Sequence, residues 1–222
     1  MTRGMIAILS RDGANLDYLT RWVRAQDGWD LVQPRGDEIA HQRNEAVLTF
    51  LATSGERLVF IDSDCAPPLD ALSRLAARNR PLLGGVVLDR TSMEVCATKA
   101  FEPLVRVSLS ETARPGVIPV VALGTGCLMV HREVFVWLDL PWFRCGQLVA
   151  DVLAEDTDFC LRAAERGFPP SLDCEVRTGH VVQGIAWPRE DGIWVQWEGA
   201  PYLLPLAVVH HEQQEARLPL GR

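Results

Sequence analysis

Two aspartates separated by one residue form a candidate site for chemistry. The segment Arg57–Pro68, RLVFIDSDCAPP, begins as an apolar run and changes abruptly at Asp62, Ser63 and Asp64. The apolar run is typical of a strand buried on both faces of a sheet, and the two prolines prevent its continuation. On an extended backbone, carboxylates at positions i and i+2 point to the same side, where they repel each other. A divalent cation removes that repulsion, and hard cations such as Mg²⁺ and Mn²⁺ take oxygen ligands.

The same residues also fit a strand that ends in an Asp-rich turn, because Asp and Ser favour turns. Two later features bear on the cation hypothesis. Glu155-Asp156 opens a predicted helix, where acidic residues either interact with the helix dipole or accept a proton from a hydroxyl. His180 follows a strand and a glycine. As a neutral imidazole it would complete a cation site, although a lone histidine is commonly structural.

Two polar groups near the N-terminus complete the set of candidate residues. Ser10 and Arg11 follow the first predicted strand, and Gln42, Arg43 and Asn44 lie early in a predicted helix. Taken alone, these residues fit a loop and a helix surface.

The elements that position these residues alternate as β-α-β-α-β over the first sixty residues. The predicted elements are Met5–Ser10, Leu16–Gln26, Trp29–Val32, Glu38–Thr53 and the strand before Asp62. This alternation predicts a parallel sheet with helices on its faces. Ligands of such sheets bind beyond the carboxyl ends of the strands, where Ser10, Arg11 and Asp62–Asp64 lie.

The later part of the chain predicts further strands and helices. We expect a helix over Leu69–Arg78, a strand over Pro81–Leu88, short strands of a mixed or antiparallel region within residues 91–120, a strand in Leu123–Val130, a surface loop over Pro141–Asp151, a helix over Ala154–Gly167 and a strand over Ser171–Val176.

The composition is that of a globular protein with ample core, at 222 residues, 48% hydrophobic and 23% charged. The net charge of −7 argues against a broad nucleic-acid-binding surface. Without an apolar run near the length of a membrane span or a signal-peptide pattern, we expect a cytoplasmic protein. The six cysteines are scattered with no CxxC pair, which argues against zinc or a disulfide framework.

The order of the motifs resembles the GT-A glycosyltransferases. IDSD after the third strand is followed by Gly124-Thr125-Gly126, then by AEDTDFCLRAAERGF, then by a strand that ends in Gly179-His180. The similarity covers about Met5 to His180. It is closest to family 2, whose members use a nucleotide-diphospho-sugar donor. It implies an α/β fold of the GT-A type, which is Rossmann-like, with a mostly parallel sheet, flanking helices and a small mixed antiparallel part.

The resemblance also implies roles for individual residues. Asp62 and Asp64 would hold Mn²⁺ or Mg²⁺ against the donor pyrophosphate, with Asp64 the more direct ligand and His180 completing the site. In an inverting enzyme Asp156, or else Glu155, would be the general base; the residues do not decide between inversion and retention. The residues implied in binding the donor are Ser10, Arg11, Arg43, Asp62, Ser63, Gly124, Thr125 and Gly126.

We therefore expect residues 1–185 to form a GT-A glycosyltransferase domain. Residues 186–222 would be a short Trp-rich extension that packs on the same domain and is a candidate acceptor-side element. Its tryptophans Trp187, Trp194 and Trp197 either pack over the sheet or stack on an acceptor. Two departures from the family are the loop SRDG, which lacks the usual proline, and the shortness of the chain.

The expected function is metal-dependent transfer of a sugar from a nucleotide-diphospho-sugar to a hydroxyl acceptor, which is a small molecule, a glycan, a protein or modified DNA. One alternative is the same transfer onto a hydroxylated base in DNA, which requires a basic path to the site. A nucleotidyltransferase is a second alternative, although SRDGAN fits its phosphate loop poorly. A third is a non-catalytic module that binds a nucleotide-sugar.

Overall fold

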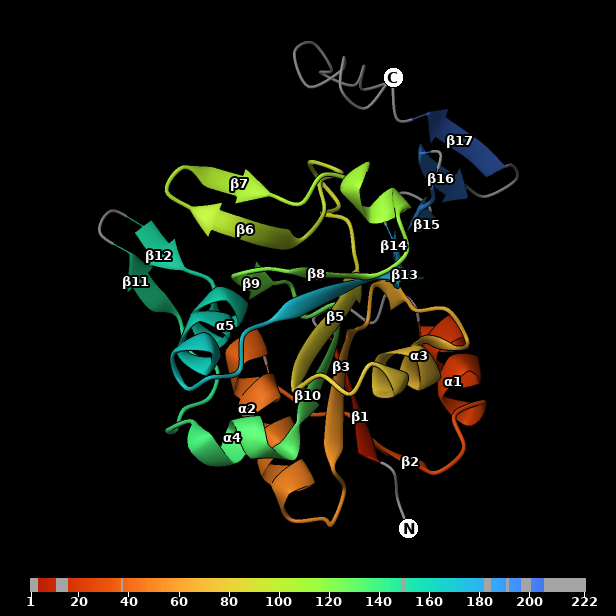
Figure 1. Ribbon diagram of the computed structural model, residues 1–222. Coiled ribbons are helices and arrows are strands. Elements are labelled where there is room, and N and C mark those ends of the chain that lie inside the picture. Colours follow the sequence, from red (N-terminus) through yellow and green to blue (C-terminus); the bar gives the residue numbers. More distant parts are fainter. Residues whose placement is uncertain are drawn as a thin grey trace.

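A seven-stranded sheet with the order β2-β1-β3-β10-β5-β13-β8 forms the centre of the molecule (Figure 1). The computed structural model describes residues 4–10, 16–36, 38–148, 151–181, 185–190, 192–196 and 201–205. The strands are β1 (Gly4–Leu9), β2 (Trp29–Val32), β3 (Arg57–Asp62), β5 (Leu82–Val86), β8 (Val117–Pro119), β10 (Cys127–His131) and β13 (Ser171–Arg177). β10 and β8 run antiparallel to their neighbours, and the other strands share one direction.

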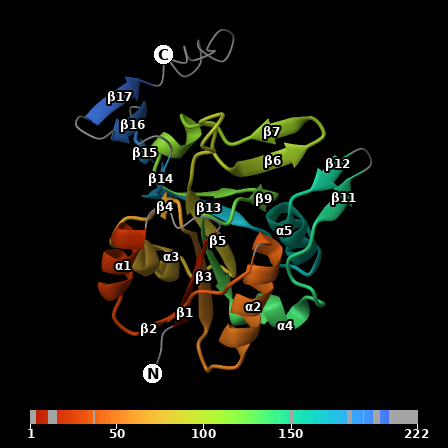
Figure 2. The ribbon, with the colours of Figure 1, turned by 180° about the vertical axis from the view of Figure 1, so that it is seen from behind.

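Helices cover both faces of this sheet (Figures 1 and 2). α1 (Leu16–Arg24) and α3 (Ala71–Ala77) lie on one face, and α2 (Ile39–Leu51), α4 (Arg132–Trp137) and α5 (Glu155–Glu165) lie on the other. Because successive side chains of a strand point to opposite faces, Ile6 and Ile8 join the core under α1 and α3, whereas Ala7 and Leu9 join the core under α2. An uninterrupted apolar strand is therefore what a sheet covered on both faces requires.

The segment predicted as a surface loop, Pro141–Asp151, is in part buried. Trp142 and Phe143 are 4% and 1% exposed, and Phe143 stacks on Phe159 of α5 with ring centroids 4.4 Å apart. Asn44 fixes this segment, because its side chain accepts a hydrogen bond from the Phe143 amide (3.0 Å) and donates one to the Phe143 carbonyl (2.7 Å). The chain then forms a hairpin of β11 (Gly146–Leu148) and β12 (Asp151–Leu153). The surface-loop prediction is thus wrong for this segment.

Two smaller sheets and a 3-10 turn complete the described chain. β6 (Ala97–Phe101), β7 (Leu104–Arg106) and β9 (Ala122–Leu123) form one sheet. β6, β7 and the turn η1 (Glu111–Ala113) lie within the region 91–120 that was predicted as mixed or antiparallel, and β9 follows it directly. The other sheet has the order β17-β16-β15-β14-β4. Its strands are β4 (Cys65–Ala66), β14 (Gly179–Val181), β15 (Ile185–Pro188), β16 (Gly192–Gln196) and β17 (Pro201–Pro205).

The C-terminal strands therefore continue a sheet that begins directly after Asp64. Trp187 and Trp194 occupy opposed positions on β15 and β16, and Trp197 lies outside the described residues. That residues 186–222 form an acceptor-side element stays a prediction.

The predicted fold class is confirmed: the structure is α/β with a mostly parallel central sheet, flanking helices and separate antiparallel parts. Within the described residues, the longest apolar helices all fall short of what a membrane crossing needs.

Candidate functional site

A cavity of about 290 Å³ opens at the carboxyl ends of β1, β3 and β5. Ten of the twelve predicted site residues line it: Arg43, Asp62, Ser63, Asp64, Gly124, Thr125, Gly126, Glu155, Asp156 and His180. Ser10 follows the lining residue Leu9 in the chain, and Arg11 lies outside the described residues. Segments far apart in the sequence thus converge where ligands of open α/β sheets bind.

Arg43 joins three of these segments. Its guanidinium is 3% exposed and donates hydrogen bonds to the carboxylate of Glu155, to the Thr125 hydroxyl and, at 3.3 Å, to Asp62. Arg43 and Glu155 therefore form an ion pair within the protein. This leaves Arg43 as a buried connection between α2, β3 and α5 that faces the cavity.

The two aspartates of the DxD motif point to different partners. Ser63 and Asp64 form a turn, so the alternation expected of an extended backbone does not apply to them. Asp62 faces Arg43, while the Asp64 carboxylate lies 3.1 Å from His180 Nε2 and 3.4 Å from Arg90. Burial raises the pKa of Asp62 despite the opposing charge of Arg43. Burial also acts to raise the pKa of Asp64, but its contact with His180 outweighs this and lowers the pKa.

His180 is held by its second ring nitrogen. Nδ1 lies 2.5 Å from the carbonyl oxygen of Leu88, and since a carbonyl only accepts, Nδ1 carries a proton. In the neutral ring, Nε2 then presents a lone pair to the Asp64 carboxylate, so two acceptors face each other unless a proton or a cation lies between them. Burial lowers the pKa of His180, and the contacts with Asp64 and Leu88 more than compensate, so the pKa is raised. Metal-binding histidines are commonly oriented by such a bond to a backbone carbonyl.

One group of three metal-ligand types occurs among the described residues: the ligand atoms of Asp64, Cys65 and His180 lie within 4.8 Å of one another. Asp62 is not part of this group. The structure thus brings together two of the three residues predicted to hold a metal and places a thiol beside them.

Asp156 lies in the first turn of α5, where its carboxylate accepts a hydrogen bond from the Thr157 amide at 2.6 Å. Burial, and secondarily the negative charge of Glu155, raises the pKa of Asp156 to about 6. A carboxylate with such a pKa is ionised at neutral pH and is more basic than an exposed one, which suits a general base.

The Gly124-Thr125-Gly126 segment lies against two cysteine side chains. A Cβ atom on Gly124 would lie 3.0 Å from Cβ of Cys96, and one on Gly126 would lie 2.8 Å from Sγ of Cys65. The approach at Gly126 is closer than Cβ atoms tolerate, and the approach at Gly124 is tight. The glycines thus allow Thr125 to reach Arg43 from a backbone that packs against the cavity wall.

Gln42 has a structural role at the edge of the site. It is fully buried and bonds the carbonyl of Ser10 (2.9 Å), the amide of Ser10 (3.1 Å) and the carbonyl of Gly36 (2.6 Å). Gln42 therefore fixes the chain where it leaves β1.

The sequence motifs assign no role to the four charged or thiol-bearing residues that also line the cavity, Cys65, Asp89, Arg90 and Cys96. The charged pair Asp89-Arg90 carried a signal, since it directly follows a predicted strand on the side where ligands bind. The two cysteines gave no such signal in the sequence, because their spacing does not show which strand lies beside them.

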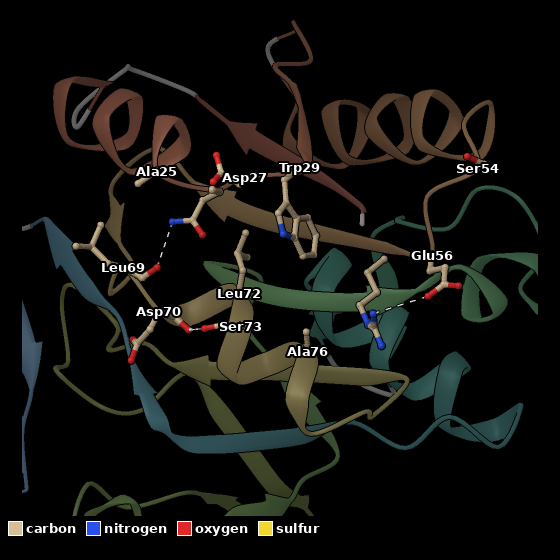
Figure 3. A pocket seen from close by; sticks show the side chains of 12 residues that line it. Ala25, Asp27, Trp29, Ser54, Glu56, Leu69, Asp70, Leu72, Ser73 and Ala76 are labelled. Atoms are coloured by element: carbon tan, nitrogen blue, oxygen red, sulfur yellow. Dashed lines mark hydrogen bonds and ion pairs between the residues drawn. The ribbon is translucent and has the colours of Figure 1, made fainter. Parts of the chain in front are cut away.

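A larger cavity of about 910 Å³ lies at the opposite, amino ends of β2 and β3 (Figure 3). Trp29 of β2 projects into it beside Leu72 and Ala76 of α3, and Asp27 and Asp70 lie at its margin (Figure 3). None of the predicted site residues lines it. Although this cavity is larger, the cavity at the carboxyl ends of the strands is therefore the better candidate for the active site.

No protein-family model and no curated protein matches the chain. Among solved structures, the chain is similar to A197 from STIV, with 15% identity, a TM-score of 0.61, and coverage of 90% of this chain and 97% of that one. It is also similar to TarS of S. aureus (13% identity, TM-score 0.44, 78% and 58% coverage). A third similar structure is the mannosyltransferase PcManGT from Pyrobaculum calidifontis, solved with GDP-Man and Mn²⁺. Its identity is 16% and its TM-score 0.44, with coverage of 77% of this chain and 56% of that one.

The likeness to A197 concerns the fold alone, because the identity is low. The TM-scores of TarS and PcManGT, both 0.44, are too low to say anything about the activity of this chain. The chain thus shares its α/β fold with A197.

Proposed function

We propose that the chain is a glycosyltransferase that moves a sugar from a nucleotide-diphospho-sugar to a hydroxyl acceptor with the help of Mn²⁺ or Mg²⁺. One observation carries the proposal. A single cavity at the carboxyl ends of the strands holds both the Asp64–His180 pair and the carboxylate of Asp156 with its raised pKa. These are the two kinds of group that sugar transfer needs: one to hold a cation and one to take a proton.

The residues present fit a divalent cation. Asp64 and Nε2 of His180 face each other at 3.1 Å as ligand atoms, and Leu88 fixes the tautomer that leaves Nε2 free to bind. Asp62 lines the same cavity and adds a second carboxylate. A cation bound there would stabilise the negative charge that develops on the leaving diphosphate.

Asp156 is the proposed base for an inverting transfer. Its carboxylate removes the proton from the acceptor hydroxyl while the oxygen forms a bond to the sugar carbon and the bond from that carbon to the diphosphate oxygen breaks. Glu155 is the weaker candidate, because its carboxylate is paired with the buried Arg43. A positioned base contributes about 10²–10⁴-fold to such a rate.

The donor is proposed to lie against Ser10, Arg11, Ser63 and the Gly124–Gly126 segment. Arg90 joins this set, since its guanidinium is 59% exposed, lines the cavity and lies 3.4 Å from Asp64. With Asp64 turned toward a cation, Arg90 becomes available to the diphosphate, whose two charged groups suit the guanidinium fork.

Thermal unfolding with a panel of nucleotide-diphospho-sugars, with and without Mn²⁺, tests the proposal. A donor at 100 times its dissociation constant stabilises the folded chain by about 2.7 kcal/mol. We expect a shift that needs both Mn²⁺ and one donor, and that is lost in Asp64→Asn. A donor-dependent shift with no transfer to any hydroxyl and no hydrolysis favours the non-catalytic module. Release of pyrophosphate from a nucleoside triphosphate favours the nucleotidyltransferase.

The acceptor class, the cytoplasmic location and the acceptor-side part of residues 186–222 belong to the same proposal. The support for the acceptor-side part is the sheet that links β14, which carries His180, to β15–β17. An acceptor held by these strands would lie on the side of the molecule that also holds the cation pair.

A further inference from the structure

Cys65 and His180 are directly opposed residues of the antiparallel pair β4–β14. Directly opposed residues of such a pair place their side chains on the same face of the sheet, close together. The thiol therefore lies beside the imidazole because of strand register, which fixes it more firmly than a loop would.

We infer that Cys65 is a third ligand of the cation site, so that Asp64, Cys65 and His180 together bind Zn²⁺ or Co²⁺ in addition to the Mn²⁺ or Mg²⁺ proposed for transfer. The inference rests on the proposed cation site and adds a ligand to it. Carboxylate, thiolate and imidazole are the ligand types of zinc, at bond lengths of about 2.0–2.3 Å. A tetrahedral site with these bonds separates its ligand atoms by about 3.3–3.7 Å.

The observed atoms are close to that arrangement. The Asp64 and His180 ligand atoms are 3.1 Å apart, and all three ligand atoms lie within 4.8 Å. The backbone is fixed on both sides of the group, since the Val181 amide donates to the Asp64 carbonyl at 2.7 Å. Side-chain rotations that bring the sulfur to within about 3.7 Å of the other two ligand atoms would close the three atoms around one ion.

The rest of the cavity wall supports the same conclusion. Sγ of Cys65 packs against Gly126, where a Cβ atom would approach within 2.8 Å, so the sulfur is confined to the group. A thiolate favours zinc and cobalt over magnesium. In the sequence, the scattered cysteines argued against zinc because no two of them have the spacing of a ligand pair. In the structure, the partner of Cys65 is instead a histidine from a distant part of the chain, His180.

Binding exchanges the thiol proton for the metal. A thiol binds a metal ion as the thiolate, so the bound ion takes the place of the thiol proton. The proton passes to solvent, and no oxidant or reductant takes part.

Titration of the metal-free full-length chain with Co²⁺ tests the inference, because a bound thiolate gives a near-ultraviolet charge-transfer band. We expect the wild-type chain to show the band, Cys65→Ser to lose it, and Cys96→Ser to keep it. Cys96 is the matched control: it lines the same cavity but lies outside the ligand group. Co²⁺ binding without the band in the wild-type chain would overturn the inference, as would a band that persists in Cys65→Ser.

A parallel measurement separates failure of this inference from failure of the proposed function. If Co²⁺ gives no band but a donor still stabilises the wild-type chain in the presence of Mn²⁺, the thiol is not a ligand and the glycosyltransferase proposal stands. If the band is present but no donor binds, the metal site stands without the proposed function. If no cation binds, both are wrong.

Discussion

Glu155 and Asp156 are neighbours in the chain, yet their surroundings give them different chemistry. Arg43 holds the carboxylate of Glu155, whereas Asp156 forms no ion pair within the described part of the chain and its pKa is raised to about 6. Two carboxyl groups in different environments are a common way to separate a structural role from a proton-transfer role.

Replacing Asp156 with Asn should slow transfer by about 10²–10⁴-fold and leave donor binding unchanged. In the wild-type chain, kcat/KM should fall as the pH drops below about 6, because the base becomes protonated. A pH–rate profile measures this. Glu155→Gln is the neighbouring control. A wild-type profile that is flat from pH 5 to 8 would contradict the assignment.

The same substitution should stabilise the folded chain at high pH. The pKa of Asp156 is higher when folded (about 6) than its ordinary value of 3.8, so the folded state binds the proton more tightly and stability falls as the pH rises between these values. One pK unit corresponds to about 1.4 kcal/mol. Asp156→Asn should therefore gain at least about 1 kcal/mol at pH 8 in urea unfolding and nothing at pH 3. An equal effect at both pH values would exclude this origin.

Arg90→Ala should weaken donor binding while leaving stability within about 0.5 kcal/mol, because the side chain is exposed and its contact with Asp64 is at the surface. Calorimetric titration with the donor in the presence of the cation measures the loss. Arg166→Ala is the matched control, since Arg166 is similarly exposed and pairs with Asp139 away from the cavity. Equal donor affinity in both variants would remove Arg90 from the site.

At the scale of elements, the glycines beside Thr125 are expected to be intolerant of substitution. Gly126→Ala places a methyl group 2.8 Å from Sγ of Cys65, and overpacking of this kind costs about 1–3 kcal/mol. Urea unfolding of Gly126→Ala should show this loss, and Cys65→Ala in the same chain should restore part of it by removing the sulfur. Additive effects of the two substitutions would show that they do not share this contact.

The elements that repeat a simple pattern were predictable from the sequence, and those fixed by distant partners were not. The strands around Met5 and Asp62 are apolar throughout, and both helix-covered faces of the sheet follow from that. Trp142 and Phe143 lie among turn-forming residues, so nothing local revealed that Asn44 and Phe159 bury them.

In the candidate site, too, the features set by local sequence were predictable and those set by distant contacts were not. The sequence predicted most of the residues that line the cavity, because its motifs end strands or open a helix. It did not predict that Asp62 turns to Arg43, since the turn at Ser63 depends on the amide of Ser63 bonding the carbonyl of Leu9 in the next strand. Nor did it predict the proximity of Cys65 to His180, which depends on strand register.

At the scale of the whole molecule, the charge distribution disfavours the DNA alternative. The net charge is −7, and three arginines of a candidate basic path are paired with carboxylates: Arg74 with Asp70 (2.6 Å), Arg78 with Asp173 (2.9 Å) and Arg106 with Glu94 (3.5 Å). Fluorescence anisotropy should therefore detect no binding to duplex DNA with hydroxylated bases at physiological salt. Binding that weakens steeply with added salt would instead support that alternative.

The position of β10 determines when the site can exist during synthesis of the chain. β10 lies between β3 and β5 and pairs with both, so these two strands are not joined until residues 127–131 have left the ribosome. Asp62 and Asp64 emerge much earlier, and His180 emerges later still, on a strand that pairs beside Cys65. A nascent chain therefore carries the aspartates without a complete cavity until β10 has been made, and His180 joins them only when β14 pairs with β4.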